Sequence, residues 1–301
     1  MKKILVFFIL MTFFTAFAEK GPIVVGSKID TEGGLLGNMI VVVLENNDYK
    51  VINKVQLGVT SILRKAIASG QIDIYPEYTG NGGFFFPDID KTLFKNHQKG
   101  YEAVKAADYK ANKVVWLTPS PANNTWAIAV RKDLATSHNL KTLEDMAKYI
   151  NKGGKIVLAA SEEFANRPDT LKAFQSTYGF ELQKDQMLLF SGGNTAQTEK
   201  AAATGTNGVN FAMAYGTDGA LSALGLVVLD DTKGVQPVYA PAPVIRESVL
   251  KKYPEIKNLL KGVFTSLTRE RLQKLNASIQ VGGQDSYTAA KKYLEKNGFI
   301  K

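Results

Sequence analysis

Cysteine is absent from this chain of 301 residues, and histidine occurs only twice, as His97 and His138. Without thiols the protein forms no disulfide, no zinc–thiolate site and no cysteine nucleophile. The two histidines stand in polar surroundings without a second ligand at metal-binding spacing. No Ser-His-Asp arrangement and no phosphate-binding Gly-x-x-x-x-Gly-Lys loop occurs either. We therefore expect no metal, no cofactor and no enzymatic activity.

Long apolar runs are missing after the first residues of the chain. Met1-Lys2-Lys3 precedes an apolar run from Ile4 to Phe14, and Ala16-Phe17-Ala18 follows. This order predicts a secretory signal peptide over residues 1–18. A membrane anchor is the weaker alternative, because a helix needs roughly 20 apolar residues to span a bilayer. With neither disulfide nor lipid-modified cysteine, the mature chain is expected in a bacterial periplasm.

The net charge of +9 is spread along the chain. Pairs such as Lys251 and Lys252 alternate with acidic residues, and no basic stripe with interleaved aromatics appears. We therefore expect no nucleic-acid binding. Glu162 and Glu163 are adjacent carboxylates, and their surroundings favour a solvated helix end over an acid–base role.

Strand and helix patterns alternate through the first hundred residues. A buried strand over 23–25, a helix capped by Asp30 or Thr31, a strand over 50–57 and a helix from Thr60 to Gly70 come first. A short strand around Ile72 and Ile74 follows, so the order predicts an α/β fold with a parallel sheet. Pro76 and Gly80 indicate a turn that carries Tyr75 and Tyr78.

Prolines then separate two halves. Pro119 and Pro121 interrupt two strands and predict a first crossing between lobes. The middle segment repeats the strand–helix alternation, with Pro168 opening a helix, and Pro237 and Pro241 mark the return. The remaining tail is predicted to be mostly helical, over 248–252, 256–264, 271–279 and 286–296.

Aromatic residues cluster at the predicted strand ends. Quaternary ammonium groups have no N–H to donate, so proteins bind them on the electron-rich faces of aromatic rings. Lys28 and Arg167 stand at other loop ends and are suited to a carboxylate. A trimethylammonium carboxylate satisfies both kinds of group. Tyr75 and Trp116 are interpreted as core residues.

Six segments together resemble the substrate-binding proteins of ABC transporters for glycine betaine, choline and carnitine. They are Val-Val-Gly-Ser-Lys at 24–28, the stretch 63–80 ending in Tyr-Pro-Glu-Tyr-Thr-Gly, Pro-Ala-Asn-Asn-Thr-Trp-Ala-Ile-Ala-Val-Arg at 121–131, Asn-Arg-Pro-Asp at 166–169, Tyr-Gly-Thr-Asp-Gly at 215–219 and Ala-Pro-Val-Ile-Arg-Glu at 242–247. The resemblance implies a two-lobed type II periplasmic binding protein. Each lobe would be a mostly parallel sheet flanked by helices, with the ligand cleft between them. Lobe 1 would comprise 19–120 plus 235–301, and lobe 2 would comprise 121–234.

By the same resemblance, an aromatic cage around the quaternary ammonium would consist of Tyr78, Trp126, Tyr215 and Tyr239. Lys28 and Arg167 would hold the carboxylate, with Asn81 and Asn124 at two further ligand-binding positions. Trp126 stands where tyrosine is more usual, and Asn124 where some members carry an acid.

The resemblance implies a monomeric protein that delivers glycine betaine to the permease and ATPase subunits of an ABC transporter. A choline- or carnitine-specific protein of the same type is an alternative. From other classes, an enzyme acting on a quaternary amine and a sensor or adhesin domain of similar fold are the rivals.

Overall fold

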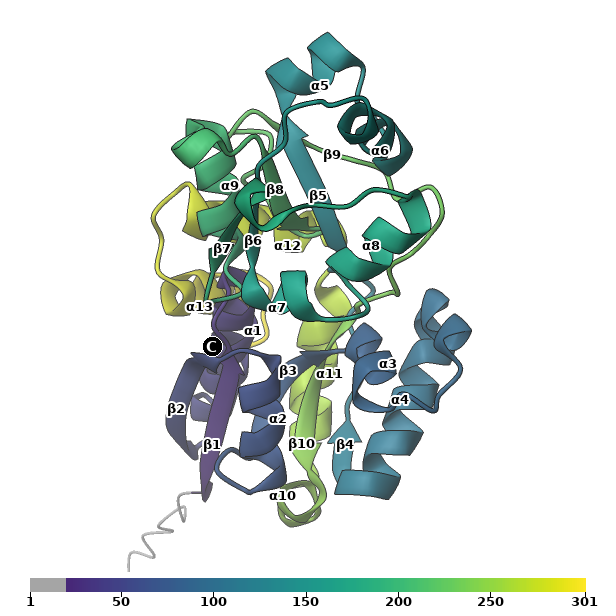
Figure 1. Cartoon of the computed structure of the whole chain (residues 1–301). Coiled ribbons are helices and arrows are strands. Elements are labelled where there is room, and N and C mark those ends of the chain that lie inside the picture. Colours follow the sequence, from purple (N-terminus) through teal and green to yellow (C-terminus); the bar gives the residue numbers. More distant parts are fainter. Residues whose placement is uncertain (1–19) are drawn as a thin grey trace, which may run out of the picture.

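A computed structural model describes residues 20–301, which form two lobes, each built on a five-stranded sheet flanked by helices (Figure 1). The two-lobed α/β class predicted from the sequence is confirmed. The predicted signal peptide, residues 1–18, lies outside the described residues. Among residues 20–301, no helix has the length and apolar character needed to cross a bilayer.

The sheet of lobe 1 takes strands from both ends of the chain. Its spatial order is β2 (Tyr49–Gly58), β1 (Lys20–Lys28), β3 (Ile74–Tyr78), β10 (Pro241–Arg246) and β4 (Val114–Trp116). Strand β1 runs parallel to β2 and β3, whereas β10 runs antiparallel to β3 and β4.

The sheet of lobe 2 comes from the middle of the chain. Its order is β7 (Met187–Phe190), β6 (Leu158–Ser161), β8 (Phe211–Tyr215), β5 (Trp126–Arg131) and β9 (Leu226–Val228). Strand β6 pairs parallel with β7 and β8, and β5 pairs antiparallel with β8 and β9. Both sheets are therefore mixed in equal parts rather than mostly parallel, because β10 and β5 each run against their neighbours.

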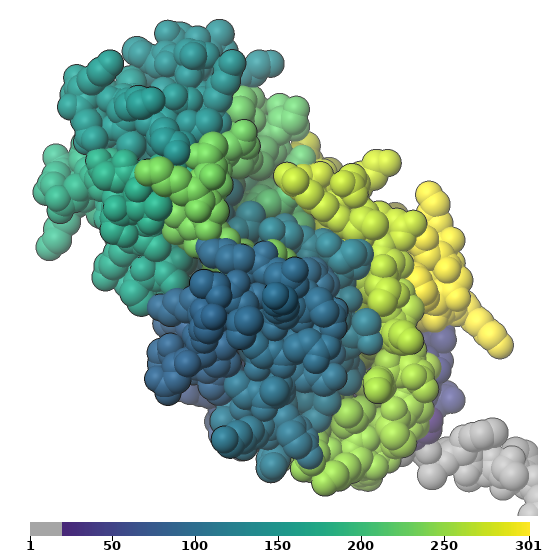
Figure 2. Space-filling model, turned by 90° about the vertical axis from the view of Figure 1, so that its right-hand side faces the viewer, coloured from purple at the N-terminus to yellow at the C-terminus, as the bar shows by residue number. Residues whose placement is uncertain are grey.

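Helices cover both sheets. Those following the strands of lobe 1 are α1 (Thr31–Glu45), α2 (Thr60–Ala68), α3 (Gly82–Phe85) and α4 (His97–Asn112). Those of lobe 2 are α5 (Lys132–His138), α6 (Leu143–Asn151), α7 (Glu162–Asn166), α8 (Leu171–Tyr178) and α9 (Thr195–Thr204). The predicted helical tail is confirmed as α10 (Glu247–Lys252), α11 (Ile256–Ser266), α12 (Arg269–Gln280) and α13 (Ser286–Lys296). In Figure 2 these last helices, lime to yellow, form a band along one flank of lobe 1.

Some local predictions were wrong. Tyr75 and Tyr78 lie within β3 and not on a turn after it. Pro76 stands directly opposite Pro243 of β10. In an antiparallel pair of strands, every second pair of facing residues exchanges no backbone hydrogen bonds, and proline fits at such a position. Strand β10 was not predicted because its two prolines argue against a sheet strand. Pro168 lies in the turn before α8 and does not open the helix.

Helix α12 connects the two lobes. It packs on α1 of lobe 1, and its Arg269 and Gln273 side chains donate to the Gly216 carbonyl of lobe 2 at 3.1 and 3.2 Å. Gly219 lies so close that an added Cβ would be 1.9 Å from the Gln273 carbonyl oxygen. The loop after β8 can therefore pack against α12 only because Gly219 has no side chain.

A buried ion pair supports the helices beside β3. Asp108 on α4 is fully buried and accepts both Nη atoms of Arg64 on α2, at 2.8 and 2.7 Å. It also accepts Trp116 Nε1 at 2.8 Å and Asn112 Nδ2 at 2.8 Å. One carboxylate thus ties α2 and α4 to strand β4, and Trp116 is a core residue as predicted.

We expect Asp108→Asn to lower the free energy of unfolding by about 3–5 kcal/mol, because it leaves the Arg64 guanidinium buried without its counter-charge. Urea unfolding measures the loss. Asp133→Asn is the matched control, since its partner Arg131 forms an exposed pair and should be replaceable without measurable cost. Equal stability of the two variants would contradict the prediction.

Candidate functional site

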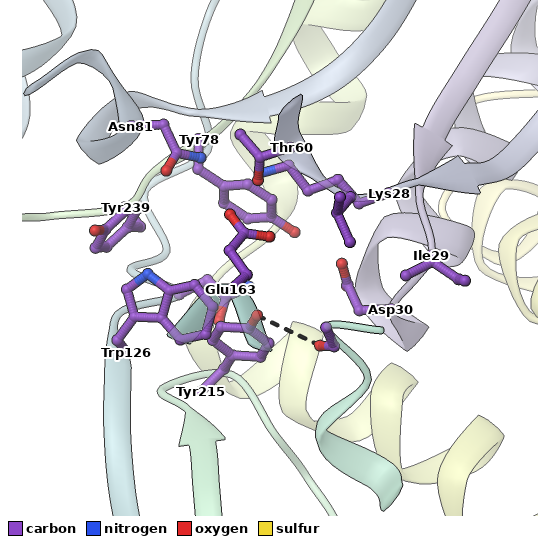
Figure 3. Close-up of a pocket in the computed structure, with 13 residues that line it drawn as sticks. Lys28, Ile29, Asp30, Thr60, Tyr78, Asn81, Trp126, Glu163, Tyr215 and Tyr239 are labelled. Atoms are coloured by element: carbon purple, nitrogen blue, oxygen red, sulfur yellow. Dashed lines mark hydrogen bonds between the residues drawn. The ribbon is translucent and has the colours of Figure 1, made fainter. Parts of the chain in front are cut away.

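A cavity of about 420 Å³, partly open to solvent, lies between the two lobes. The lining residues are Lys28, Ile29, Asp30, Val59, Thr60, Tyr78, Asn81, Asn124, Trp126, Glu163, Gly193, Tyr215 and Tyr239 (Figure 3).

Seven of the eight residues predicted for the site line this one cavity. The exception is Arg167, which does not line the cavity but bonds to Asn81, which does. The seven come from segments more than 200 positions apart in the sequence, between Lys28 and Tyr239. The structure thus brings seven residues singled out by sequence into one cavity.

The turn between β1 and α1 forms one wall. Asp30 caps α1 as predicted, accepting the Gly33 N–H at 2.7 Å. An added Cβ on Gly33 would approach the Lys28 carbonyl oxygen to 2.7 Å, so glycine lets the helix begin directly behind Lys28. Burial raises the pKa of Asp30, against the lowering effect of the Gly33 bond.

Lys28 already has an anionic partner. Its Nζ lies 2.8 Å from Glu77 Oε1 and 4.8 Å from the centre of the Tyr78 ring. Glu77 is fully buried and also accepts Tyr75 Oη at 2.9 Å and Asn81 Nδ2 at 2.8 Å. The lysine therefore does not present a free charge to the cavity.

The aromatic wall of lobe 2 is made by two neighbouring strands. Trp126 of β5 and Tyr215 of β8 are register partners, with ring centres 4.7 Å apart and planes inclined by 48°. Tyr239, on the segment that returns to β10, lies beside Trp126 in Figure 3. Burial raises the pKa of Tyr78, Tyr215 and Tyr239, so all three are neutral phenols at neutral pH.

Arg167 is held by partners from both lobes. Its Nε and Nη2 donate to the two carboxylate oxygens of Asp169, at 2.9 and 2.7 Å. Its Nη1 donates to Glu163 at 2.9 Å and to Asn81 of lobe 1 at 3.0 Å, while its guanidinium lies 4.2 Å from the Phe84 ring centre. Burial lowers the pKa of Arg167, but its bonds to Asp169 outweigh this effect and keep it charged.

Behind the cavity, one carboxylate joins three elements. Glu32 in the first turn of α1 accepts Tyr78 Oη at 3.1 Å, Asn124 Nδ2 at 3.0 Å and Asn276 Nδ2 of α12 at 2.8 Å. Asn276 also donates to the Thr217 carbonyl in lobe 2 at 3.0 Å. Burial raises the pKa of Glu32 to about 7. This group therefore changes charge near neutral pH inside the contact between lobes.

Two buried acidic residues, Asp218 and Glu199, lie near Tyr215. Asp218 accepts the Tyr215 N–H at 2.6 Å and the Thr195 hydroxyl at 3.0 Å. Burial raises the pKa of Asp218 to about 6. Burial, followed by repulsion from Asp218, raises the pKa of Glu199 much further, so Glu199 is protonated at neutral pH. The tyrosine is thereby fixed to the start of α9.

Two carboxylates of the cavity were missed as site residues. Asp30 was predicted only as a helix cap, and Glu163 was interpreted as part of a solvated helix end. Both line the cavity, and the Glu163 side chain is only 16% exposed. Their positions in the sequence could have identified them as site residues, because Asp30 follows a strand end and Glu163 precedes Arg167 by one helical turn. Within residues 20–301, no cluster of three or more potential ligands could hold a metal ion.

The fold and the cavity between its lobes are those of a two-lobed solute-binding protein. The model of the family described as the substrate binding domain of ABC-type glycine betaine transport systems matches residues 21–296. The chain belongs to this family.

Known relatives agree with this assignment. The glycine betaine-binding protein YehZ of Escherichia coli K12 is 57% identical over 280 residues, covering 93% of this chain and 92% of YehZ. The solved structure of apo YehZ superposes with a TM-score of 0.67 at 56% identity, covering 93% of this chain and all of the other. A glycine betaine/carnitine/choline ABC transporter structure gives 0.71 at 22% identity, with 93% and 100% coverage, which supports the fold.

We expect Glu32 to make stability fall with rising pH. Its pKa is about 7 in the fold against an ordinary 4.5, so between these values the folded state retains a proton that the unfolded state releases. The stabilisation is complete below pH 4.5 and is lost as the pH rises through 7, by up to about 3 kcal/mol.

Urea unfolding at pH 5 and pH 8 measures this effect. Glu32→Gln should have a smaller stability difference between the two pH values than the wild-type protein. Glu45→Gln, at the exposed end of the same helix, is the control and should keep the wild-type difference. An unchanged difference in Glu32→Gln would contradict the assignment.

Proposed function

We propose that this chain is a periplasmic solute-binding protein that captures glycine betaine between its lobes and delivers it to an ABC permease. The observation that carries the proposal is the cavity between the lobes, which is walled by four aromatic residues and bordered by carboxylates. Membership of the family and the similarity to YehZ support the same ligand class.

The quaternary ammonium group would be held by Tyr78, Trp126, Tyr215 and Tyr239. A trimethylammonium group presents only methyl groups, so its positive charge is best met by ring faces and by nearby carboxylates rather than by hydrogen bonds. Each ring contributes roughly 0.5–2 kcal/mol when the contact excludes water. Asp30 adds a carboxyl group to the lining of the same cavity.

The ligand carboxylate would be bound by Lys28 and Arg167, with Asn81 and Asn124 completing the polar contacts. Both cations are engaged, Lys28 with Glu77 and Arg167 with Glu163 and Asp169. A ligand carboxylate must therefore share or displace a protein partner. We infer an affinity in the micromolar range or weaker, because part of the binding free energy is spent on this exchange.

Binding would close the two lobes by rotation about the segments that connect them. We propose lobe 1 as residues 19–120 plus 235–301 and lobe 2 as residues 121–234, with residues 1–18 removed as a signal peptide on export. The protein would act as a monomer without cofactor, nucleic acid or catalysis, and its partners would be the permease and ATPase subunits. Ligand contact with both lobes stabilises the closed form that the permease recognises.

Choline is the second candidate ligand. It has the same quaternary ammonium group but a neutral hydroxyl in place of the carboxylate, so it does not compete with Glu77 or Glu163 for the cations. The engaged state of Lys28 and Arg167 favours it. Carnitine, which carries both a hydroxyl and a carboxylate, is a longer variant of the first candidate.

Trp126→Ala tests the cage. We expect it to weaken binding of glycine betaine and choline by about ten- to thirtyfold, since it removes one aromatic face and its buried area. Isothermal titration of the chain from Glu19 onward, with glycine betaine, choline, carnitine and proline, measures the change.

Trp126→Tyr is the conservative control and should bind within a few-fold of the wild-type protein. The chain has two tryptophans, and the other, Trp116, lies in the core. A ligand-dependent change in tryptophan emission should therefore disappear in Trp126→Tyr. Heat of binding that survives unchanged in Trp126→Ala would exclude the cage, and no heat with any of the four solutes would exclude the proposed ligand class.

A further inference from the structure

We infer that Glu163 determines whether this site prefers a zwitterionic or a purely cationic quaternary amine. The inference rests on the proposed function and names a residue that decides among its ligands. Glu163 belongs to α7 of lobe 2, and its carboxylate points into the cavity in Figure 3. It is both a charge on the cavity wall and a partner of Arg167.

The donors of Arg167 show why Glu163 matters. A guanidinium group has five N–H bonds in one plane. Asp169 takes the Nε–H and one N–H of Nη2, while Glu163 and Asn81 take the two of Nη1. A single N–H on Nη2 is left. A ligand carboxylate can therefore form a two-pronged contact only on the edge between Nη1 and Nη2, and there it competes with the two partners of Nη1, Glu163 and Asn81.

Glu163 is the partner that a ligand would displace. Asp169 grips the opposite edge of the guanidinium with both oxygens and does not line the cavity. Asn81 lines the cavity but is neutral, so it does not repel a carboxylate. Glu163 lines the cavity and carries a negative charge that a ligand carboxylate would approach closely. Competition for Arg167 therefore takes place mainly between the ligand and Glu163.

The same charge acts oppositely on the other end of a ligand. Glu163 shares the cavity wall with Asp30, Trp126 and Tyr215. A carboxylate among aromatic faces attracts a quaternary ammonium group over several ångströms where little water screens the charge. Choline gains this attraction without loss, whereas glycine betaine gains it at one end and meets repulsion at the other. Glu163 thus favours choline relative to glycine betaine.

Glu163→Gln removes the charge and keeps the size of the side chain. We expect choline to bind about tenfold more weakly and glycine betaine to bind as well as or better than in the wild-type protein, so that the ratio of the two dissociation constants shifts at least tenfold. Isothermal titration of the mature protein with each solute measures both constants. Glu162→Gln, an exposed neighbour on the same helix, is the matched control and should leave the ratio unchanged.

Glu163→Ala and the melting temperatures of the ligand-free variants separate charge from folding. The alanine variant also lacks the charge and should shift the ratio in the same direction. Equal weakening of both solutes, or an unchanged ratio in a folded variant, would overturn the role of Glu163 while leaving the proposed ligand class standing. Absence of binding by the wild-type protein would overturn the proposed function and this inference with it.

Discussion

Arg167 is a permanent cation with a side chain only 6% exposed, and it must keep hydrogen-bonding partners whether or not a ligand is present. A buried charge without partners costs several kcal/mol. Asp169 and Glu163 meet this need within lobe 2, and Asn81 meets it from lobe 1. The polar side of the cavity is arranged around this requirement. Any anion that binds Arg167 must replace one of these hydrogen-bonding partners.

Lys28 of lobe 1 is likewise paired with a carboxylate of the protein. Glu77 neutralises it and is itself fixed by Tyr75, Asn81 and the backbone of Tyr78. Each lobe therefore balances its own cation before a ligand arrives. Binding of a carboxylate at either cation is therefore an exchange of partners between charged groups rather than the capture of an unpaired charge. Such exchange favours selectivity over high affinity.

The lobes also meet behind the cavity, at the buried carboxyl group of Glu32. Glu32 receives hydrogen bonds from Tyr78, from Asn124 near the crossing and from Asn276 of α12. Helix α12 follows the return of the chain to lobe 1, yet Asn276 holds the Thr217 carbonyl of lobe 2. The position of an aromatic wall residue is thus coupled to the contact between lobes through one buried carboxyl group.

Local sequence patterns were sufficient for most helices and for the strands that alternate with them. Apolar periodicity and capping residues act over a few positions, so they can be recognised in the sequence without the tertiary structure. They failed where a strand depends on distant neighbours. Strand β10 contains Pro241, which is its first residue, and Pro243, which stands opposite Pro76 of β3. The equal mixture of parallel and antiparallel pairs has the same origin, since strand direction depends on where the chain returns.

The sequence by itself indicated seven residues that line one cavity, because the motifs that carry them occur in a specific order along the chain. Only the tertiary structure decided what those residues contact. The pairing of Lys28 with Glu77 joins two residues 49 positions apart at 2.8 Å, which no local spacing encodes. Glu163 resembled a solvated helix residue because the wall that encloses it is built from both lobes.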